Sequence, residues 1–371
     1  MTGCIKCVLD SDEPGVILDE YGQCNWCNWD EEMRQKYNND KLAPLIEEIK
    51  RNRKKGHYGC IIGVSGGCDS SYLLQWAAKE GLTPLAVNYD DTYSTKQATD
   101  NIYNLTTKLG VDLDTFTVDS DQIDDIYRAF IRERLPDIDA PTDLALAKVI
   151  MEAARKNEVK YVLDAHDFRS EGTTPLGWLY FDGKYLESVT KKHGISLKGF
   201  PNLWLKDMLR YAALRIERPR PMYYMNYNRD DAATMLKRDY GWADYGGKHS
   251  ENTMTKFSNW VWLTKVFGLD LRKIFLSAQI RSGIISRQAA LAKLEHPPLE
   301  QKERNQLVDE IADRLDTGNF SVREEMRSPE RRSHLDYDTY LPIFKKYGIV
   351  FKGMAKFGLI PETFVKKYVR Q

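Results

Sequence analysis

The chain has 371 residues, of which 42% are hydrophobic, so it can form two domains or one large domain around a sizeable core. Lysine plus arginine equals aspartate plus glutamate at 54 each, and this balance argues against a nucleic acid as the main partner. The N-terminus lacks a signal-peptide pattern, and no apolar run approaches the roughly 18 residues of a membrane span. We therefore expect a cytoplasmic protein without a membrane span.

Four of the six cysteines lie near the N-terminus in two Cys-x-x-Cys pairs, which are Cys4 with Cys7 and Cys24 with Cys27. Two such pairs, 16 residues apart, are typical of a zinc ion held by four thiolates. Four protein ligands leave no open position, so we expect a structural Zn²⁺. Disulfides and an iron–sulfur cluster are the alternatives. The segment 19–22 between the pairs has the composition of a hairpin end.

Residues 30–55 are charged and helix-forming, and Leu42, Leu45, Ile46 and Ile49 form an apolar stripe. This pattern predicts one helix that leads from the cysteine module onto the next domain. The basic run 51–55 is expected to be a solvated helix end.

A strand, a glycine turn and a helix start follow one another between Tyr58 and Trp76. The two glycines at positions 66 and 67 let the backbone approach a ligand, and the first helical turn presents free N–H groups to negative charge. The string Ser-Gly-Gly-Cys-Asp-Ser at 65–70 resembles the PP-loop of the ATP pyrophosphatases, which holds the β,γ-pyrophosphate of ATP. No lysine follows the glycines and a third glycine is missing, so the common mononucleotide and dinucleotide loops do not fit. A plain connecting turn is the alternative.

Strands and helices alternate from this point, which indicates a parallel sheet with helices on both faces. The expected strands are 60–64, 84–88, 114–118 and 161–163, and the expected helices are 69–80, 95–109, 121–134 and 142–157. In such sheets the ligand lies beyond the carboxyl ends of the strands. The segment 88–91 is therefore expected near the adenine or ribose, and the ionisable loop 164–172 near phosphate, metal and substrate. Ordinary polar turns are the alternative for both.

The remainder is expected to be mostly helical. A hairpin is predicted over 177–189 around Asp182 and Gly183, and an apolar core helix over 259–267. The loop 241–252 combines aromatic, glycine and charged residues, which indicates function. The tail 337–369 is expected to be helical, with basic, solvated faces. The predicted divisions are a zinc-binding module (1–30), a helical linker (31–57), an ATP-binding domain (58–195) and a mostly helical substrate or partner region (196–371).

The two cysteine pairs, the 65–70 loop and Gly-Trp-Ala-Asp-Tyr-Gly-Gly-Lys-His at 241–249 together resemble one family. It is the N-acetyl sugar amidotransferases of bacterial surface-polysaccharide biosynthesis, and the likeness covers nearly the whole chain. It includes the segments 166–172 and 175–178 and the pair Ser286-Arg287. The family loop often has lysine where this chain has Cys68.

The resemblance implies a nucleotide-linked sugar with acetamido groups, of the UDP-diacetamido uronic acid type, as substrate. ATP with Mg²⁺ would adenylate an acetamido oxygen, and ammonia would replace AMP to leave an acetamidino group. The residues predicted to bind ATP are Val64, Ser65, Gly66, Gly67, Asp69, Ser70, Asn88, Asp164 and His166. The predicted catalytic residues are Asp69, Glu171, Lys248 and His249, and the predicted substrate contacts are Arg169, Glu171, Lys248 and His249.

No glutaminase site is visible in the sequence, because glutaminases need a nucleophilic cysteine. Residue 2 is threonine, Cys4 and Cys7 are assigned to the metal, Cys60 lies in a strand, and Cys68 lies in the phosphate loop. The family likewise takes ammonia from a separate glutaminase and its cyclase-like partner.

Two other functions fit part of the pattern. A tRNA-thiolating PP-loop enzyme would share the loop and the zinc knuckles, but it would use further cysteines and bind a polyanion. A non-enzymatic nucleotide-binding or scaffold protein would not need Asp69 and Ser70.

Overall fold

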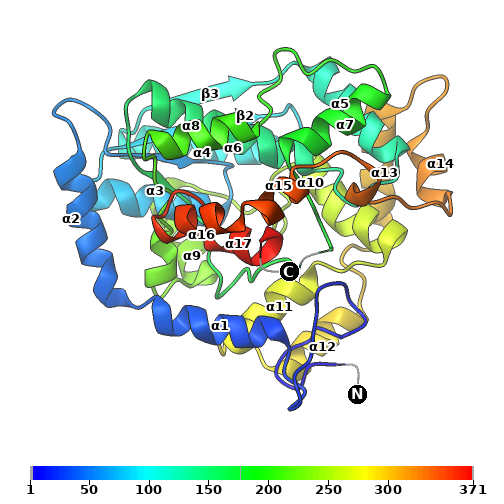
Figure 1. Cartoon of the computed structure of the whole chain (residues 1–371), viewed down its shortest axis with the longest axis horizontal. Coiled ribbons are helices and arrows are strands. Elements are labelled where there is room, and N and C mark those ends of the chain that lie inside the picture. Colours follow the sequence, from blue (N-terminus) through cyan, green and yellow to red (C-terminus); the bar gives the residue numbers. More distant parts are fainter. Residues whose placement is uncertain (1–2, 176, 370–371) are drawn as a thin grey trace.

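A four-stranded parallel sheet forms the centre of the protein, with the strands in the order β3-β2-β1-β4 (Figure 1). The structure, a computed structural model, describes residues 3–175 and 177–369, so Thr2 and Leu176 lie outside the described residues. The strands are β1 (Cys60–Gly63), β2 (Pro84–Asp90), β3 (Leu113–Thr117) and β4 (Val162–Leu163). The predicted α/β fold with a parallel sheet is confirmed.

Helices cover both faces of the sheet, because successive strand side chains point to opposite sides. Ile62 packs with Leu74 of α3 on one face, and Ile61 packs with Met151 of α6 on the other. The helices of this part are α3 (Cys68–Lys79), α4 (Lys96–Leu109), α5 (Ser120–Arg132) and α6 (Ala140–Lys156). All four lie where the sequence predicts them, within two residues at each end.

The segment after α8 extends the sheet beyond β4. Glu217 forms a parallel bridge with Tyr161, and the N–H of Asp164 donates to the carbonyl of Pro219 at 3.1 Å. This pairing carries Arg218 and Arg220 to the same edge as the ends of β1 and β4, although the sequence predicts no strand in this segment.

The single helix predicted over 30–55 is wrong. The chain forms α1 (Asn25–Lys36), a 3-10 turn η1 (Asn39–Lys41) and α2 (Leu42–Asn52). The break falls at Tyr37, whose backbone is extended and whose ring packs edge-on against Tyr223 and Tyr224. Tertiary aromatic packing therefore overrides the local helical propensity. The basic run 51–55 is exposed, as predicted.

The hairpin predicted over 177–189 is also wrong, because helix α7 (Gly183–Lys192) begins inside it. Asp182 is the N-cap, and its carboxylate accepts hydrogen bonds from the backbone N–H groups of Lys184 and Tyr185 at 2.8 and 2.7 Å. The Asp-Gly pair that resembles a hairpin turn is thus a helix start. Nearby aromatic residues such as Tyr185 enter the largest core cluster instead of a strand.

The rest of the chain is mostly helical, as predicted. The elements are α8 (Leu205–Ala213), η2 (Pro221–Tyr224), α9 (Arg229–Tyr240), α10 (Thr253–Phe257), the π-helix η3 (Ser258–Phe267), α11 (Arg272–Arg281), α12 (Arg287–Glu295), α13 (Gln301–Leu315), α14 (Val322–Arg327), η4 (His334–Asp336), α15 (Leu341–Lys346), α16 (Gly348–Lys356) and α17 (Glu362–Tyr368). Trp260 and Trp262 of η3 are buried, which confirms that this helix belongs to the core.

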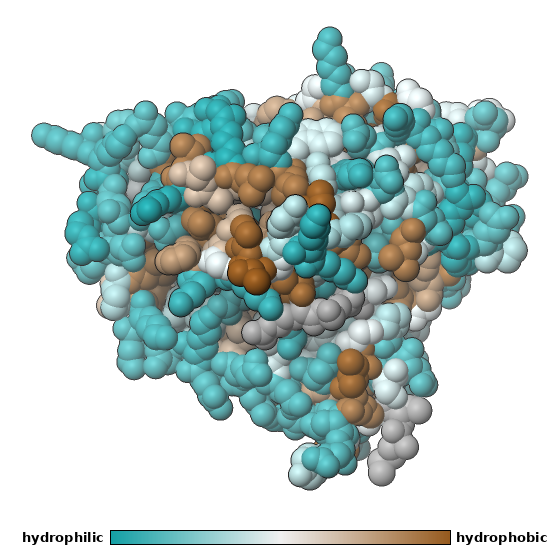
Figure 2. Space-filling view, viewed as in Figure 1, coloured by the Kyte–Doolittle hydropathy of each residue, from teal (hydrophilic) through white to brown (hydrophobic). Residues whose placement is uncertain are grey.

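The N-terminal module lies beside α11 and α12, and α15 to α17 lie at the front of the view (Figure 1). The same face is mostly hydrophilic, except for an apolar area at its centre (Figure 2). Among the residues that the structure describes, no helix combines the length and the apolar character needed to cross a bilayer.

Candidate functional site

The 65–70 segment, which we call the phosphate loop after its predicted role, connects β1 to α3 at the carboxyl edge of the sheet. Gly66 has a φ of +76°, and a Cβ at this position would lie 2.2 Å from the carbonyl oxygen of Ala98 in α4. Only glycine fits such a position. Gly67 is the N-cap of α3, so the free N–H groups of the first helical turn point out of the loop. Ser65 is exposed, while Asp69 and Ser70 are half-buried. The loop thus combines a fixed backbone with an open side.

The loop 241–252 packs directly on the phosphate loop. The indole N–H of Trp242 donates to the carbonyl of Gly66 at 3.0 Å, and the side chain of Asn101 bridges Gly66 and Ala243. A Cβ on Gly67 would lie 3.3 Å from both the Tyr245 hydroxyl and Glu251 Oε1. Two segments far apart in the sequence therefore form one site, and Asn101, which the sequence analysis missed, joins them.

An ion pair between Lys248 and Glu171 lies at the centre of this site. Lys248 Nζ is 2.7 Å from Glu171 Oε1, and both side chains are 17% exposed. Burial opposes the charged form of Glu171, but Lys248 outweighs it and lowers the pKa of Glu171 well below its usual value. Burial likewise opposes the charged form of Lys248, and Glu171 and Asp69 raise its pKa. The pair is therefore charged at neutral pH.

Asp69 faces the same cluster. The phenol of Tyr227 donates a hydrogen bond to Asp69 Oδ1. Burial and the negative charge of Glu171 raise the pKa of Asp69 to about 7, although Lys248 and Tyr227 act in the opposite direction. A carboxyl group with this pKa changes charge near neutral pH, and a bound divalent cation would hold it ionised.

The two histidines predicted for the site are neutral at pH 7, because burial lowers the pKa of both His166 and His249 to about 4. His166 is also held in place, since its Nδ1 is 3.0 Å from the Tyr223 hydroxyl and its Nε2 is 2.9 Å from the carbonyl oxygen of Gly172. His249 has a φ of +57°, an uncommon conformation for this residue.

Two buried polar atoms near the loop have no hydrogen-bond partner in the described residues, and these are Glu251 Oε2 and Arg229 Nη2. Burial raises the pKa of Glu251. The backbone of Arg229 lies at the loop, because its carbonyl accepts from the Cys68 thiol at 3.6 Å. Unpaired buried polar groups are costly unless a ligand forms hydrogen bonds with them. Glu251 and Arg229 are therefore further candidates for contacts with a bound ligand. Arg229 and Tyr227 follow no motif in the sequence, whereas Glu251 lies in the loop that was singled out.

The other residues predicted to bind ATP lie at or near the ends of the strands. Asp164 accepts from Arg220 Nε at 3.0 Å, and although burial opposes it, the neighbouring arginines lower its pKa. Asn88 is half-buried within β2, and Val64 is buried directly before the loop.

Arg169 does not join the cluster. Its guanidinium donates to the backbone carbonyls of Tyr223 at 2.7 Å and Tyr37 at 3.2 Å, and it lies over the ring of Phe168. These contacts tie the loop after β4 to the segment that follows α1. The position indicates that Arg169 supports the loop from outside.

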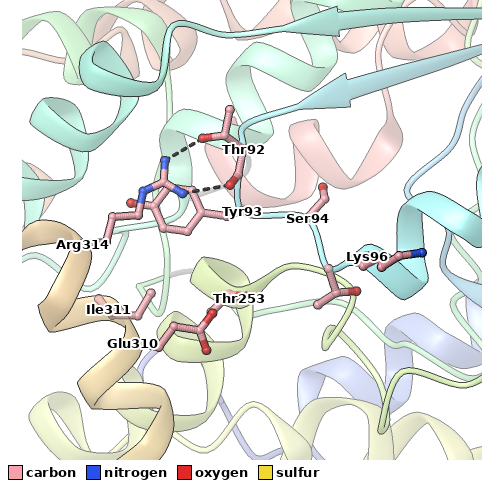
Figure 3. A pocket seen from close by; sticks show the side chains of 9 residues that line it. Thr92, Tyr93, Ser94, Lys96, Thr253, Glu310, Ile311 and Arg314 are labelled. Atoms are coloured by element: carbon pink, nitrogen blue, oxygen red, sulfur yellow. Dashed lines mark hydrogen bonds between the residues drawn. The ribbon is translucent and has the colours of Figure 1, made fainter.

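A separate cavity of about 300 Å³ lies beyond the end of β2 (Figure 3). Arg314 lies on its wall and donates to the carbonyl and the hydroxyl of Thr92 at 2.8 and 2.6 Å (Figure 3). Its guanidinium is also paired with Asp124. Because its main cation is already engaged and no predicted site residue lines it, this cavity does not carry the site.

The four cysteines of the N-terminal module form a second buried cluster. Cys4 and Cys27 have sulfurs 3.9 Å apart, and Cys7 and Cys24 have sulfurs 3.7 Å apart. All four ligand atoms lie within 4.8 Å of one another, and none is in a disulfide. Zn–S bonds of about 2.3 Å in a tetrahedron separate the sulfurs by roughly 3.8 Å, which fits these distances. The four cysteines are therefore placed to hold one metal ion, and the hairpin end at 19–22 is confirmed by the bridge between Leu18 and Cys24.

The cysteine site contacts the C-terminal helices. Arg287 donates to the carbonyls of Cys7 and Cys4 at 3.0 and 3.4 Å, and Arg281 lies 3.8 Å from the sulfur of Cys27. Arg281 is also 3.4 Å from Asp30. Two arginines from α11 and α12 thus compensate the negative charge that thiolates would carry.

Residues 251–349 match the family model described as LPS biosynthesis protein WbpG-like, C-terminal domain. We refer to residues 251–349 as the WbpG-like domain, because they are similar to that family model. This match confirms the predicted resemblance to surface-polysaccharide enzymes. The WbpG-like domain begins at Glu251 beside the phosphate loop and includes Arg281 and Arg287, so it contacts both polar clusters.

The chain is also similar to an uncharacterised protein of Methanocaldococcus jannaschii, with 29% identity over 136 residues. That alignment covers 35% of this chain and 47% of the relative, so the chain spans about half of the relative's length.

Among solved structures, the NMN synthetase of Francisella tularensis gives 15% identity over 64% of this chain and 94% of that chain, with a TM-score of 0.28. The NH3-dependent NAD synthetase of Campylobacter jejuni gives 15% identity over 58% and 94%, with a TM-score of 0.27. The tRNA thiolase NcsA of Methanococcus maripaludis, solved with its 4Fe-4S cluster, gives 13% identity over 81% and 91%, with a TM-score of 0.28. At these TM-scores the likeness supports no functional argument.

Proposed function

We propose that this chain is an ATP-dependent amidotransferase of surface-polysaccharide biosynthesis. It adenylates an acetamido group of a nucleotide-linked sugar and substitutes ammonia for the AMP. The observation that carries the proposal is the half-buried Lys248–Glu171 ion pair, which lies with Asp69 at an open phosphate loop. The WbpG-like domain supports the polysaccharide context.

The first step makes a leaving group of the amide oxygen. This oxygen attacks the α-phosphorus of ATP, pyrophosphate departs, and the amide nitrogen loses its proton. The loop backbone at Ser65, Gly66 and Gly67, together with the hydroxyl of Ser70, would bind the departing pyrophosphate. Asp69 would hold Mg²⁺, which neutralises phosphate charge when bound. Val64, Asn88, Asp164 and His166 would position the nucleotide.

The second step replaces AMP by nitrogen. Ammonia attacks the imidate carbon and loses one proton, and the C–O bond to AMP breaks. Lys248 can stabilise the negative charge on the phosphate, and Glu171 can stabilise the cationic carbon or accept the proton. Neutral His249 would serve as a hydrogen-bonding contact to the sugar. Glu251, with one unpartnered oxygen, is a further candidate to accept the proton.

A separate protein would supply the ammonia. Outside the metal site the chain has only Cys60 and Cys68, which are 0% and 2% exposed. Burial raises the pKa of both thiols, that of Cys68 to about 11. Neither suits the thiolate nucleophile of a glutaminase or the carriage of sulfur to a tRNA. This supports a separate glutaminase with a cyclase-like partner, and it disfavours the thiolating alternative.

Incubation of the metal-loaded protein with a UDP-diacetamido sugar, ATP, Mg²⁺ and ammonium tests the proposal. Mass spectrometry should show a sugar in which one oxygen is replaced by NH, with stoichiometric AMP and pyrophosphate. Glutamine should not replace ammonium when the chain is alone. Formation of ADP would contradict the proposal. Turnover of ATP to AMP without formation of the amidine product would contradict it as well.

A further inference from the structure

The segment α15–α16 carries the densest uncompensated positive charge of the C-terminal tail. Between Asp338 and Glu362 the chain has four lysines, at positions 345, 346, 352 and 356, and no acidic residue. The whole chain has zero net charge, so this excess is local. All four side chains are exposed, and none forms an ion pair within the described residues. From the sequence alone, such basic spots are expected to be solvated faces.

The structure places large apolar side chains among these lysines. Ile349 is 87% exposed, Phe357 is 72% exposed and Val350 is 53% exposed. We call these three residues and the four lysines the basic–apolar face. Figure 2 shows apolar side chains at the front of the molecule, in the area where α15 to α17 lie in Figure 1, with hydrophilic side chains around them.

The opposite side of α16 anchors the helix firmly. Phe351 and Met354 are buried, and the ring of Phe351 packs edge-on against Phe344 at 5.1 Å. Core formation therefore accounts for the inward residues of α16 and leaves the outward ones without a partner. Water alone does not favour bulky apolar groups at this exposure.

We propose that the basic–apolar face binds the surface of an anionic lipid bilayer. Segments that lie in the membrane interface bury bulky apolar side chains at the headgroup level and carry lysines that are attracted to anionic lipids. The cores of protein–protein interfaces are instead depleted of lysine. Protruding side chains such as Ile349 and Phe357 can enter the headgroup region while the lysines contact lipid phosphates. This surface would hold the protein reversibly at a membrane.

Vesicle co-sedimentation of the metal-loaded full chain tests this proposal. The vesicles contain either phosphatidylcholine alone or equal parts of phosphatidylcholine and phosphatidylglycerol, at low and high salt. The protein should bind the anionic vesicles at least about tenfold more tightly than the neutral ones, and added salt should weaken the binding, because each lysine near an anionic surface contributes roughly fivefold.

Two variants separate the parts of the face. Ile349→Glu/Phe357→Glu and Lys345→Gln/Lys346→Gln/Lys352→Gln/Lys356→Gln should each weaken binding by about tenfold or more. The matched controls are Ile17→Glu, at an apolar residue that is 68% exposed, and Arg51→Gln/Lys55→Gln in the other basic run, and neither should change binding. Melting temperature and ATP turnover should stay at the parent values in all four.

Three results would overturn the proposal. The first is equal binding to neutral and anionic vesicles, or binding to neither. The second is binding that requires the lysines but is unchanged in Ile349→Glu/Phe357→Glu. This result would indicate electrostatic attraction to any negatively charged surface, such as that of an acidic protein. The third is a change from dimer to monomer in the face variants without any effect on vesicle binding, which indicates an interface between two copies of the chain.

Discussion

The cysteine cluster and the phosphate-loop cluster both gather potential ligand atoms, but they differ in access. The four cysteines are 0% exposed, and their sulfurs are spaced for one tetrahedral ion. At the phosphate loop Ser65 is exposed, and Glu251 and Arg229 keep unpartnered polar atoms. A closed set of ligands suits a structural metal, whereas an open set with unsatisfied groups suits a substrate. The difference predicts that damage to the first cluster affects folding and damage to the second affects chemistry.

The largest expected effect is loss of the metal. Cys24→Ser should remove one zinc per chain, because the three remaining thiolates do not complete the four-coordinate site. Treatment with a strong chelator should have the same result. Structural zinc contributes on the order of 10 kcal/mol in small zinc modules, so the melting temperature should fall further than it does when the phosphate loop or its ion pair is altered. Metal analysis and thermal unfolding measure the result.

Cys60→Ala is the matched control for that experiment, since Cys60 is an equally buried cysteine outside the cluster. It should keep its metal. A Cys24→Ser protein with full zinc content would disprove the four-cysteine assignment. Iron and bridging sulfide in the purified parent protein would show that the site holds an iron–sulfur cluster and not zinc.

The next largest effect is expected at the phosphate loop. Gly66→Val places a branched side chain 2.2 Å from the Ala98 carbonyl at a φ of +76°, so the loop must change shape and ATP binding should be lost. Gly246→Ala is the control, because nothing lies within 4 Å of its Cβ position and only backbone strain of about 1 kcal/mol is expected. Calorimetric titration with ATP should distinguish the two. Equal affinity would show that the loop does not hold the nucleotide.

Breaking the central ion pair should lower the rate without unfolding the protein. Lys248→Ala and Glu171→Gln should each reduce amidine formation by about 10²–10³-fold, the effect of removing one transition-state contact. Lys256→Ala provides a close control, since Lys256 is 19% exposed and its side chain pairs with Glu303 of α13 at 2.7 Å. Parent rates in Lys248→Ala and Glu171→Gln, or an equal loss in Lys256→Ala, would refute the assignment.

The smallest expected effect is a shift in pH dependence. Asp69 must be ionised to hold a cation, and its pKa is raised to about 7, so kcat/KM at low Mg²⁺ should rise as the pH increases through about 7. Tyr227 stabilises the ionised form, so Tyr227→Phe should move this rise to higher pH and leave the plateau nearly unchanged. A pH–rate profile of both proteins checks the prediction. Identical pH–rate profiles would show that Tyr227 does not influence the ionisation of Asp69.

Local signals in the sequence were sufficient to predict the alternating strands and helices of the sheet domain. Strands β1 and β4 are short, buried apolar runs, and the helices between the strands have clear starts and ends, as at Gly110. The same approach failed at Asp182-Gly183, since an aspartate before a glycine suits a hairpin turn and a helix N-cap equally. Aromatic packing, which acts between distant segments, decided that case and the break at Tyr37.

The sequence by itself determined the parallel α/β fold, the glycine turn between β1 and α3 and the pairing of cysteines that form the buried cluster, because each depends on residues close together in the chain. It also singled out the loop that contains Lys248 and Glu251. Only the tertiary structure showed that this loop packs on Gly66 through Asn101 and Trp242, that Arg169 faces backbone carbonyls, and that Tyr227 bonds to Asp69. Long-range packing fixes these contacts, and no periodicity or spacing in the chain records which distant side chains will share one buried space.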